Sequence, residues 1–361
     1  MLPRRENQPW IMNRTNQRDS APEPGRAGAA WSGVPGDLDA ADVARPWSTG
    51  LRPPRLLLTL LGDYWWRRTE RLPSAALVGL LAEFGVSDSA ARAALSRLTR
   101  NDLLVTAKAG RRTVVGLSDR AAQILDEGAR HIFSFGRDTR HWDGMWSVVA
   151  FSIPEHKRPV RAALRKQLRW LGFAPLYDGL WVSPFDHAVD VVKELAELGI
   201  TTATAFRATT VPGGGPDGLP QKAWDLDDLR ARYEMFITHT QRLAEHTLAG
   251  RVSPVDALVA RTRVMDEWRA FPALDPDLPC ELLPDGWPRA SARELFITAY
   301  DLLGPLAAHR VRQIIARYSP ELAAQARHHS TELKTGPAPD VVLDDAEALA
   351  TLPLSWATGL T

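Results

Sequence analysis

The sequence predicts an α+β protein with three folded units, and two stretches carry this prediction. Residues 72–117 have the pattern of two helices separated by a glycine turn and followed by a short hairpin with a basic tip. Residues 145–206 have the pattern β-α-β-β-α-β. The first order is that of a winged helix-turn-helix and the second is that of a ferredoxin-like sandwich. Residues after 224 are mainly helical in pattern, which indicates a helical carboxy-terminal domain.

The division of the chain follows from these patterns. Residues 1–52 mix Pro, Gly, Ser, Asn and Arg without an apolar period, which is typical of a disordered arm. The predicted divisions are an arm at 1–52, a winged helix-turn-helix at 53–130, a ferredoxin-like domain at 142–209, a helical domain at 222–335 and a weakly ordered tail at 336–361.

Composition limits the class of protein. The 361 residues are 45% hydrophobic and 24% charged with a net charge of +1, as in a globular protein of two or three domains. No uninterrupted apolar run is long enough to span a bilayer. Cys280 is the single cysteine, which excludes an internal disulfide framework and fits a reducing compartment. We therefore expect a cytoplasmic protein without a membrane partner.

The predicted helix-turn-helix has a local cause at each boundary. A helix begins near Leu56, and a second one has apolar residues at helical spacing up to Phe84. Gly85 stands where a helix stop in the left-handed conformation is favoured. Ser87 is placed to cap the third helix, which Asp88 favours through the helix dipole. That helix is expected to bury Ala91, Leu95 and Leu98.

The opposite face of this third helix and the hairpin after it are predicted to bind DNA. Residues 87–116 hold six basic and two acidic side chains, a net charge of +4 that fits contact with phosphates. The alternative is a solvated arginine face on an ordinary helical hairpin. The predicted DNA contacts are Ser87, Ser89, Arg92, Ser96, Arg97, Arg100, Lys108, Arg111 and Arg112.

Ser118 is predicted to cap a further helix that runs to Gly128, followed by a linker that contains Phe133, Phe135, Arg137 and Arg140. In the ferredoxin-like domain, Asp178-Gly179 indicates a hairpin between two short strands. The expected elements are strands at 145–153, 173–176, 180–182 and 200–206 and helices at 159–171 and 188–198, the last with Val189, Val192 and Leu195 facing inward.

The helix at 159–171 carries a basic stripe of Arg161, Arg165 and Arg169 with Lys166. It is either a solvated face or a patch that touches DNA flanks or the phosphates of a ligand. The helical domain is expected to contain helices at 223–249, 253–271, 291–303 and 306–318. Tryptophans at the presumed domain boundaries, Trp142, Trp224 and Trp287, are expected to hold the domains together.

Several runs in this order resemble the PaaX family of phenylacetate-pathway repressors over residues 53–320. The runs are Leu60-Leu61-Gly62-Asp63-Tyr64, Leu81-Ala82-Glu83-Phe84-Gly85-Val86-Ser87, Ala94-Leu95-Ser96-Arg97-Leu98, Ala109-Gly110-Arg111-Arg112, Asp275-Pro276-Asp277-Leu278-Pro279, Leu282-Leu283-Pro284 and Trp287-Pro288. The resemblance implies a homodimeric regulator, usually a repressor, that releases DNA on binding an acyl-CoA. It places DNA binding on Ser89, Arg92, Ser96, Arg97, Arg111 and Arg112. The arm before residue 53 departs from the family pattern.

A dimer is expected to bind a near-palindromic operator in double-stranded DNA. The candidate residues for a small-molecule effector are Arg140, Trp146, Arg161, Arg165, Tyr177 and Trp181. No residue identifies a phenyl ring or a coenzyme A tail, so a different ligand stays open, as does a DNA-binding scaffold without an effector.

The alternative function is a metal-dependent nuclease or nucleotide-processing enzyme built on the ferredoxin-like domain. The family resemblance implies that this domain is similar to a small CRISPR-associated nuclease. That nuclease has metal-binding carboxylates at the end of its first strand. Here Ser152 stands where an Asp is expected, and a hydroxyl does not supply the anionic oxygen that Mg²⁺ prefers. We therefore predict a protein that is not an enzyme, with no metal and no cofactor.

Overall fold

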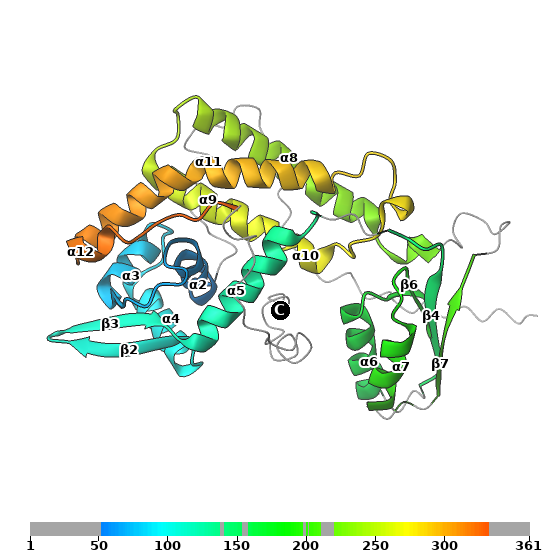
Figure 1. Ribbon diagram of the computed structural model, residues 1–361. Coiled ribbons are helices and arrows are strands. Elements are labelled where there is room, and N and C mark those ends of the chain that lie inside the picture. The colour runs from blue at the N-terminus through cyan, green and yellow to red at the C-terminus, as the bar shows by residue number, and fades with distance from the viewer. Residues whose placement is uncertain are drawn as a thin grey trace, which may run out of the picture.

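The computed structural model describes residues 52–137, 141–153, 158–197, 200, 202–210 and 220–331. Residues 1–51 of the predicted arm, the predicted tail at 336–361 and Arg140 lie outside the described residues. The chain combines helices with two small antiparallel sheets, so the α+β class is confirmed. Long helices form the top of an arch, with one sheet at each end (Figure 1). Within the described part of the chain, no helix is long and apolar enough to cross a membrane.

The amino-terminal unit contains three helices and a three-stranded sheet. The helices are α2 (Pro53–Tyr64), α3 (Ser74–Ala82) and α4 (Asp88–Arg100), and the hairpin strands are β2 (Leu104–Ala109) and β3 (Arg112–Leu117). A short strand that was not predicted, β1 (Leu72–Pro73), pairs with β3 and gives the order β1-β3-β2. Two residues have no period, so only their pairing identifies them as a strand.

The helix after the hairpin is longer than predicted. α5 runs over Asp119–Ser134 instead of ending at Gly128, so Phe133 belongs to the helix and not to a linker. Its ring is buried 5.8 Å from the rings of Phe296 and Tyr300. A glycine inside a helix costs only about 1 kcal/mol relative to alanine, and burial of an aromatic side chain exceeds that cost.

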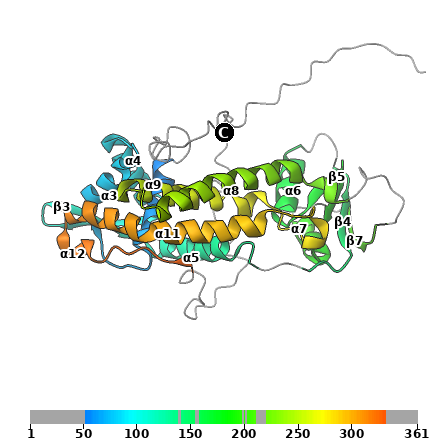
Figure 2. The same ribbon diagram turned by 90° about the horizontal axis from the view of Figure 1, so that it is seen from above.

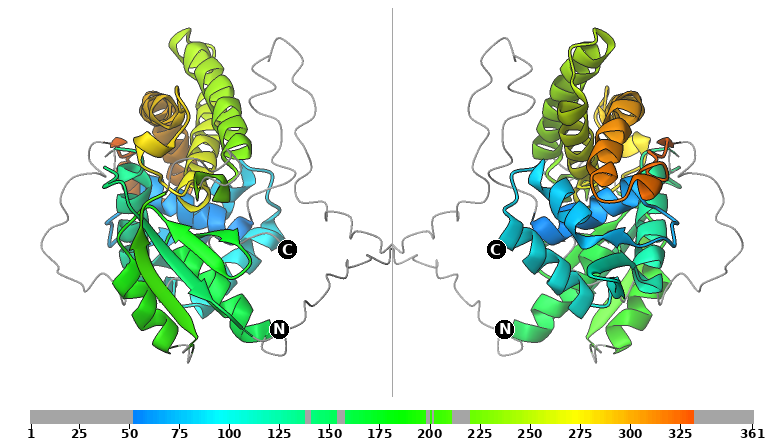
Figure 3. Two further views of the ribbon diagram at one scale, coloured as in Figure 1. Left: turned by 90° about the vertical axis from the view of Figure 1, so that its right-hand side faces the viewer. Right: turned by 90° about the vertical axis from the view of Figure 1, so that its left-hand side faces the viewer.

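The middle unit is a four-stranded sheet with two helices on one face. The strands β4 (Trp146–Phe151), β5 (Ala174–Tyr177), β6 (Leu180–Ser183) and β7 (Ala203–Ala208) lie in the antiparallel order β5-β6-β4-β7. The helices α6 (Arg158–Trp170) and α7 (Ala188–Glu197) cover one face, and the other face is turned toward the viewer on the left of Figure 3. The predicted Asp178-Gly179 turn is present, with Gly179 at φ +79°.

The prediction of the inward face of α7 was wrong at two of three positions. Val189 and Val192 are 67% and 48% exposed, whereas Val191 and Leu195 are buried. Valines occupy positions 189, 191 and 192, so the sequence allows more than one helical phase. The sheet selects the phase in which residues 191 and 195, four apart, lie on the same side.

The helical unit is built around one long helix. Its elements are η3 (Pro220–Ala223), α8 (Leu226–Leu248), α9 (Pro254–Trp268), α10 (Phe271–Leu274), η4 (Cys280–Leu282), α11 (Arg289–Ala316) and α12 (Pro320–Ala323). Figure 2 shows α8 and α11 side by side along the molecule. The two helices predicted at 291–303 and 306–318 are in fact one, since α11 continues through Pro305. Burial of Leu303, Gly304, Ala307 and Ala308 supports the helix on both sides of the proline, which removes one hydrogen bond.

The amino-terminal unit and the helical unit share one hydrophobic core. A fully buried polar network lies within it. The hydroxyl of Tyr300 donates to Asp63 Oδ1 at 2.6 Å, and Arg261 Nε donates to the carbonyl of Tyr300 at 3.0 Å. Arg261 also lies 3.7 Å above the Tyr300 ring and donates to the carbonyl of His329. The network connects α2, α9 and α11 with the segment that ends the described chain.

Replacing Arg261 tests how strongly this network stabilises the protein. Arg261 Nη1 lies 3.7 Å from Asp63 Oδ2, and both side chains are buried. Removing one partner of a buried ion pair costs about 3–5 kcal/mol because the other charge stays buried. We expect Arg261→Met to lower the free energy of unfolding in urea by this amount, and Arg261→Met/Asp63→Leu to recover part of it. Arg232→Met, at an exposed pair with Asp228, is the control and should change it by less than about 1 kcal/mol. A loss below about 1 kcal/mol for Arg261→Met would contradict this account.

Two buried tyrosines beside the Arg261 guanidinium, Tyr64 and Tyr300, predict a loss of stability in alkali. Burial raises the pKa of Tyr64 to about 12 and raises the pKa of Tyr300 well above its usual value of 10.0. The folded protein thus keeps phenol protons that the unfolded chain releases, so stability is complete below pH 10.0 and falls as the pH rises toward 12. We expect Tyr64→Phe to lose less stability over this interval in urea titrations. Equal losses in both proteins would exclude Tyr64 as a cause.

Candidate functional site

The exposed face of α4 follows from how the helix is anchored. Gly85 adopts φ +73°, and the backbone N–H of Ala90 donates to the Ser87 hydroxyl at 3.3 Å, so the predicted turn and cap are both present. Ala91, Ala94 and Leu98 are buried against the rest of the unit. Because the helix repeats every 3.6 residues, the polar positions between them face away from the core.

All predicted DNA-binding side chains are exposed and lie on two adjoining elements. The α4 group and its cap comprise Ser87, Ser89, Arg92, Ser96, Arg97 and Arg100, and the hairpin group comprises Lys108, Arg111 and Arg112. Figure 1 shows α4 next to the β2-β3 hairpin at one end of the arch. The structure therefore places residues that are up to 25 positions apart in sequence on two neighbouring elements, and it leaves each of these side chains accessible.

The arginines on α4 differ in their partners. Arg92 Nε lies 2.7 Å from Asp88 Oδ2, one helical turn away, and this hydrogen bond and the carboxylate charge raise the pKa of Arg92. Both side chains stay exposed, so the pair is screened by solvent and holds the guanidinium only loosely. Within the described part of the chain, no hydrogen-bond or ion-pair partner is seen for Arg97 or Arg100.

One hairpin arginine contacts the helical unit. Arg112 donates from Nη1 to the carbonyl of Tyr318 at 2.9 Å, just beyond the end of α11. Lys108 donates to the hydroxyl of Thr113 across the hairpin, whose turn contains Gly110 at φ +61°. Arg112 thus fastens one end of the hairpin, and Arg111 stays exposed near the tip.

A mostly buried ion pair fixes the helix before α4. Arg310 of α11 holds Glu83 in a two-point contact, with nitrogen–oxygen distances of 2.8 and 3.0 Å. Bidentate arginine–carboxylate contacts are stronger and more directional than single ones. This pair was not predicted, because its members are 227 residues apart and no local pattern connects them.

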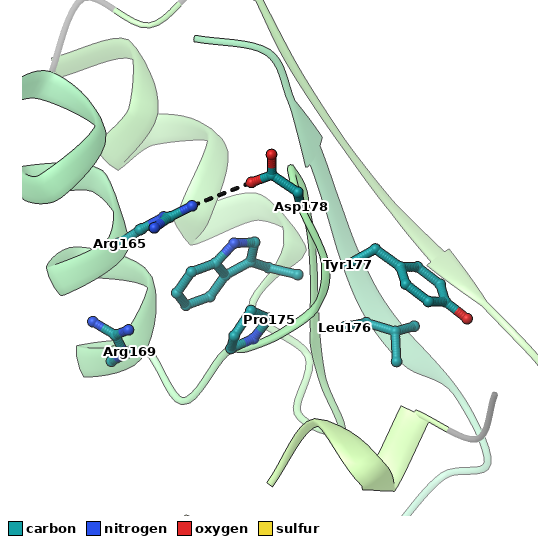
Figure 4. A pocket seen from close by; sticks show the side chains of 7 residues that line it. Arg165, Arg169, Pro175, Leu176, Tyr177 and Asp178 are labelled. Atoms are coloured by element: carbon teal, nitrogen blue, oxygen red, sulfur yellow. Dashed lines mark hydrogen bonds and ion pairs between the residues drawn. The ribbon is translucent and has the colours of Figure 1, made fainter. Parts of the chain in front are cut away.

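A second surface feature is a pocket of about 310 Å³ between α6 and the β5-β6 hairpin (Figure 4). We call it the arginine pocket; it is lined by Arg165, Arg169, Pro175, Leu176, Tyr177, Asp178 and Trp181. It unites three of the predicted effector residues, Arg165, Tyr177 and Trp181. The sequence analysis did not assign Asp178 to it and left the basic stripe that contains Arg169 undecided.

Two other predicted effector residues are not in this pocket. Trp146 is buried, with its ring 5.3 Å from that of Trp142 and 6.2 Å from that of Trp224. Arg161 donates to the carbonyl of Ile153 at 2.6 Å. Arg140 is not among the described residues.

The tryptophans at 142, 146 and 224 form a cluster with Leu282 that joins the sheet to the helical unit. This agrees with the expectation that Trp142 and Trp224 hold the domains together. Trp287 does not belong to this tryptophan cluster and packs instead against the core that the amino-terminal and helical units share. Its ring lies 6.2 Å from that of Tyr233 within the helical unit.

The residues that the structure describes contain no group of three or more His, Cys, Asp or Glu side chains able to hold a metal ion. Ser152, at the position where the nuclease alternative expects a carboxylate, is exposed just after β4 and accepts a hydrogen bond at its carbonyl from Thr202.

Comparison with known proteins finds similarity in three segments of the chain. Three family models match: PaaX-like protein at residues 52–121, PaaX protein central Cas2-like domain at 139–219 and PaaX-like protein C-terminal domain at 224–329. The chain is 28% identical over 258 residues to the Transcriptional repressor PaaX of Escherichia coli (strain K12), covering 70% of this chain and 80% of that protein. A solved structure, Uncharacterized protein Rv0674 from Mycobacterium tuberculosis, is similar at 24% identity with a TM-score of 0.47, over 73% of this chain and 99% of that one.

The cap of α4 gives a test of how the exposed face is held. Ser87→Ala removes the acceptor for the Ala90 N–H, and we expect the free energy of unfolding to fall by about 1 kcal/mol. Ser87→Gly should cost only a few tenths of that because glycine is itself tolerated at this position. Urea titrations measure both, and a larger loss for glycine than for alanine would show that Ser87 does not act as the cap.

Proposed function

The chain belongs to the PaaX family, and we propose that it is a DNA-binding transcriptional repressor. The observation that supports this most is the accessible basic surface on α4 and the β2-β3 hairpin. The similarity to a protein named as a transcriptional repressor points the same way. A repressor acts on DNA, so we place the protein in the cytoplasm.

We propose that the amino-terminal unit is a winged helix-turn-helix over residues 53–130. In this arrangement α4 enters the major groove and the hairpin contacts the backbone or the minor groove. The turn at Gly85, the capped start of α4 and the hairpin directly after it support this assignment. Arg97 and Arg100 are then the side chains best placed for bases or phosphates, since no intramolecular contact of theirs has to break.

We further propose a homodimer that binds a near-palindromic operator, because one α4 helix covers only a half-site.

We assign residues 142–209 to a ferredoxin-like domain and residues 222–335 to a helical domain. Strand order β5-β6-β4-β7 with both helices on one face supports the ferredoxin-like assignment. A small effector such as an acyl-CoA, bound to the middle unit, would release the repressor from DNA. No observation favours the nuclease alternative.

Alanine variants of α4 test the proposal. The operator is first selected with the full-length protein from a pool of random 30-base-pair duplexes. We expect Arg97→Ala to weaken operator binding by about tenfold or more and to reduce the slope of log affinity against log salt by about one if Arg97 contacts phosphate. Arg92→Ala should weaken binding as well, because Arg92 is expected to leave Asp88 and contact DNA.

Arg232→Ala, on α8 and remote from α4, is the matched control and should leave binding unchanged. Fluorescence anisotropy measures all three variants. Operator affinity equal to that of the parent protein in both Arg92→Ala and Arg97→Ala would remove α4 from the DNA interface.

A further inference from the structure

The tip of the β2-β3 hairpin extends beyond the rest of its sheet. β1 pairs with β3 only at Val114 and Val115, so residues 108–113 are paired only with one another. A two-stranded hairpin is marginally stable at best in water. The tip therefore needs a contact outside the sheet to keep one orientation.

Arg112 makes such a contact with the helical unit. Its Nη1 atom donates to the carbonyl of Tyr318 at 2.9 Å, across 206 positions of the chain. Within the described residues, no other hydrogen bond or ion pair is seen between residues 108–113 and the rest of the protein. Figures 1 and 2 both show α12 and the end of α11 beside this hairpin.

The acceptor lies at the carboxyl end of α11, where arginine is a favoured partner. The last carbonyl groups of a helix have no intrahelical donor and carry the negative end of the helix dipole. Tyr318 directly follows Arg317, the C-cap of α11, and no backbone N–H in the described chain donates to its carbonyl. Arginine side chains near a helix end stabilise such carbonyls. Arg112 is thus placed to cap α11 from a distant part of the sequence.

The same end of α11 also packs against α3. A Cβ atom added at Gly79 would lie 3.4 Å from the Tyr318 hydroxyl and 3.3 Å from Ile314, so α11 approaches closely at this glycine. One turn further along, Arg310 holds Glu83, the C-cap of α3. The end of α11 therefore contacts α3 and the hairpin together, and α4 is the helix between these two in the chain.

We infer that Arg112 is a positioning residue for the hairpin, which caps α11 and keeps its guanidinium on the Tyr318 carbonyl when DNA is bound. Arg112 then sets the orientation of the hairpin relative to α4, while Arg111, exposed beside it at the tip, contacts phosphate. A shift at the end of α11 moves α3 and the hairpin together. This assigns a role within the proposed DNA interface and so rests on the proposed function.

Hydrogen exchange of the full-length protein without DNA tests the contact. Arg112→Gln removes it from an exposed position, and we expect the amides of residues 104–113 to exchange about threefold to tenfold faster, because a hydrogen bond to a charged group is lost. The amides of residues 313–318 should exchange faster as well, because α11 loses its cap. Arg111→Gln is the charge-matched control and should leave both segments unchanged. Arg112→Lys keeps the charge and can still donate, so its exchange should be intermediate.

Binding to the selected operator separates positioning from phosphate contact. Arg111→Gln should weaken binding and reduce the slope of log affinity against log salt by about one, as loss of a phosphate contact does. Arg112→Gln should weaken binding by about threefold to tenfold, because the hairpin must then be ordered on binding, but should leave the slope unchanged. The inference is overturned by parental exchange or parental affinity in Arg112→Gln, or by a slope reduced by about one in that variant.

The proposed repressor function and this inference fail in different ways. If the parent protein selects no operator, the repressor function fails, and hydrogen exchange still decides whether Arg112 holds the end of α11. If an operator is selected and Arg112→Gln exchanges as the parent does, only the inference about Arg112 fails.

Discussion

The contacts of Arg261 fix the position of the amino-terminal unit against the helical unit. A guanidinium without solvent exposure is costly unless charge and hydrogen bonds surround it, and its partners here come from separate parts of the chain. Asp63 lies on α2, Tyr300 on α11, and the carbonyl of His329 follows α12. Only one placement of α2 against the helical unit satisfies them together. The unit that carries α4 is therefore held rigidly by the helical unit instead of being linked to it by a flexible connection.

The long helix α11 extends this constraint across the molecule. Its 28 residues span about 42 Å at 1.5 Å per residue. Near one end Arg310 holds Glu83, next to the turn before α4. At the other end Arg289 holds Asp275 and Asp277, on the segment that leads to Leu282 and the tryptophan cluster. A displacement at the joint with the middle unit thus has a stiff route to the unit that carries α4, because both ends of α11 are fastened by paired charges.

The sequence predicted the features whose causes lie within a few residues. The Ser87 and Ser118 caps, the Gly85 turn and the Asp178-Gly179 hairpin depend on local side chains and backbone angles, and the structure contains them all. The errors occur where distant packing decides. Gly128 and Pro305 are helix breakers by propensity, but both lie inside helices that packing supports. The phase of α7 and the Glu83–Arg310 pair depend on neighbours far away in the chain.

Single residues of the candidate site show the same difference between features with local causes and features that depend on distant neighbours. Helical period and net charge were sufficient to predict which side chains of α4 and the hairpin are exposed, but not what each one contacts. Arg92 has a carboxylate one turn away, Arg112 holds the carbonyl of Tyr318, and Arg97 has neither kind of contact. These differences separate residues of one type: Arg112 fastens the hairpin to the helical unit, whereas under the proposed function Arg92 would have to leave Asp88 to reach DNA and Arg97 would need no prior rearrangement. Arginines that look equivalent in sequence thus differ in the intramolecular contacts that each must give up before it can bind a partner.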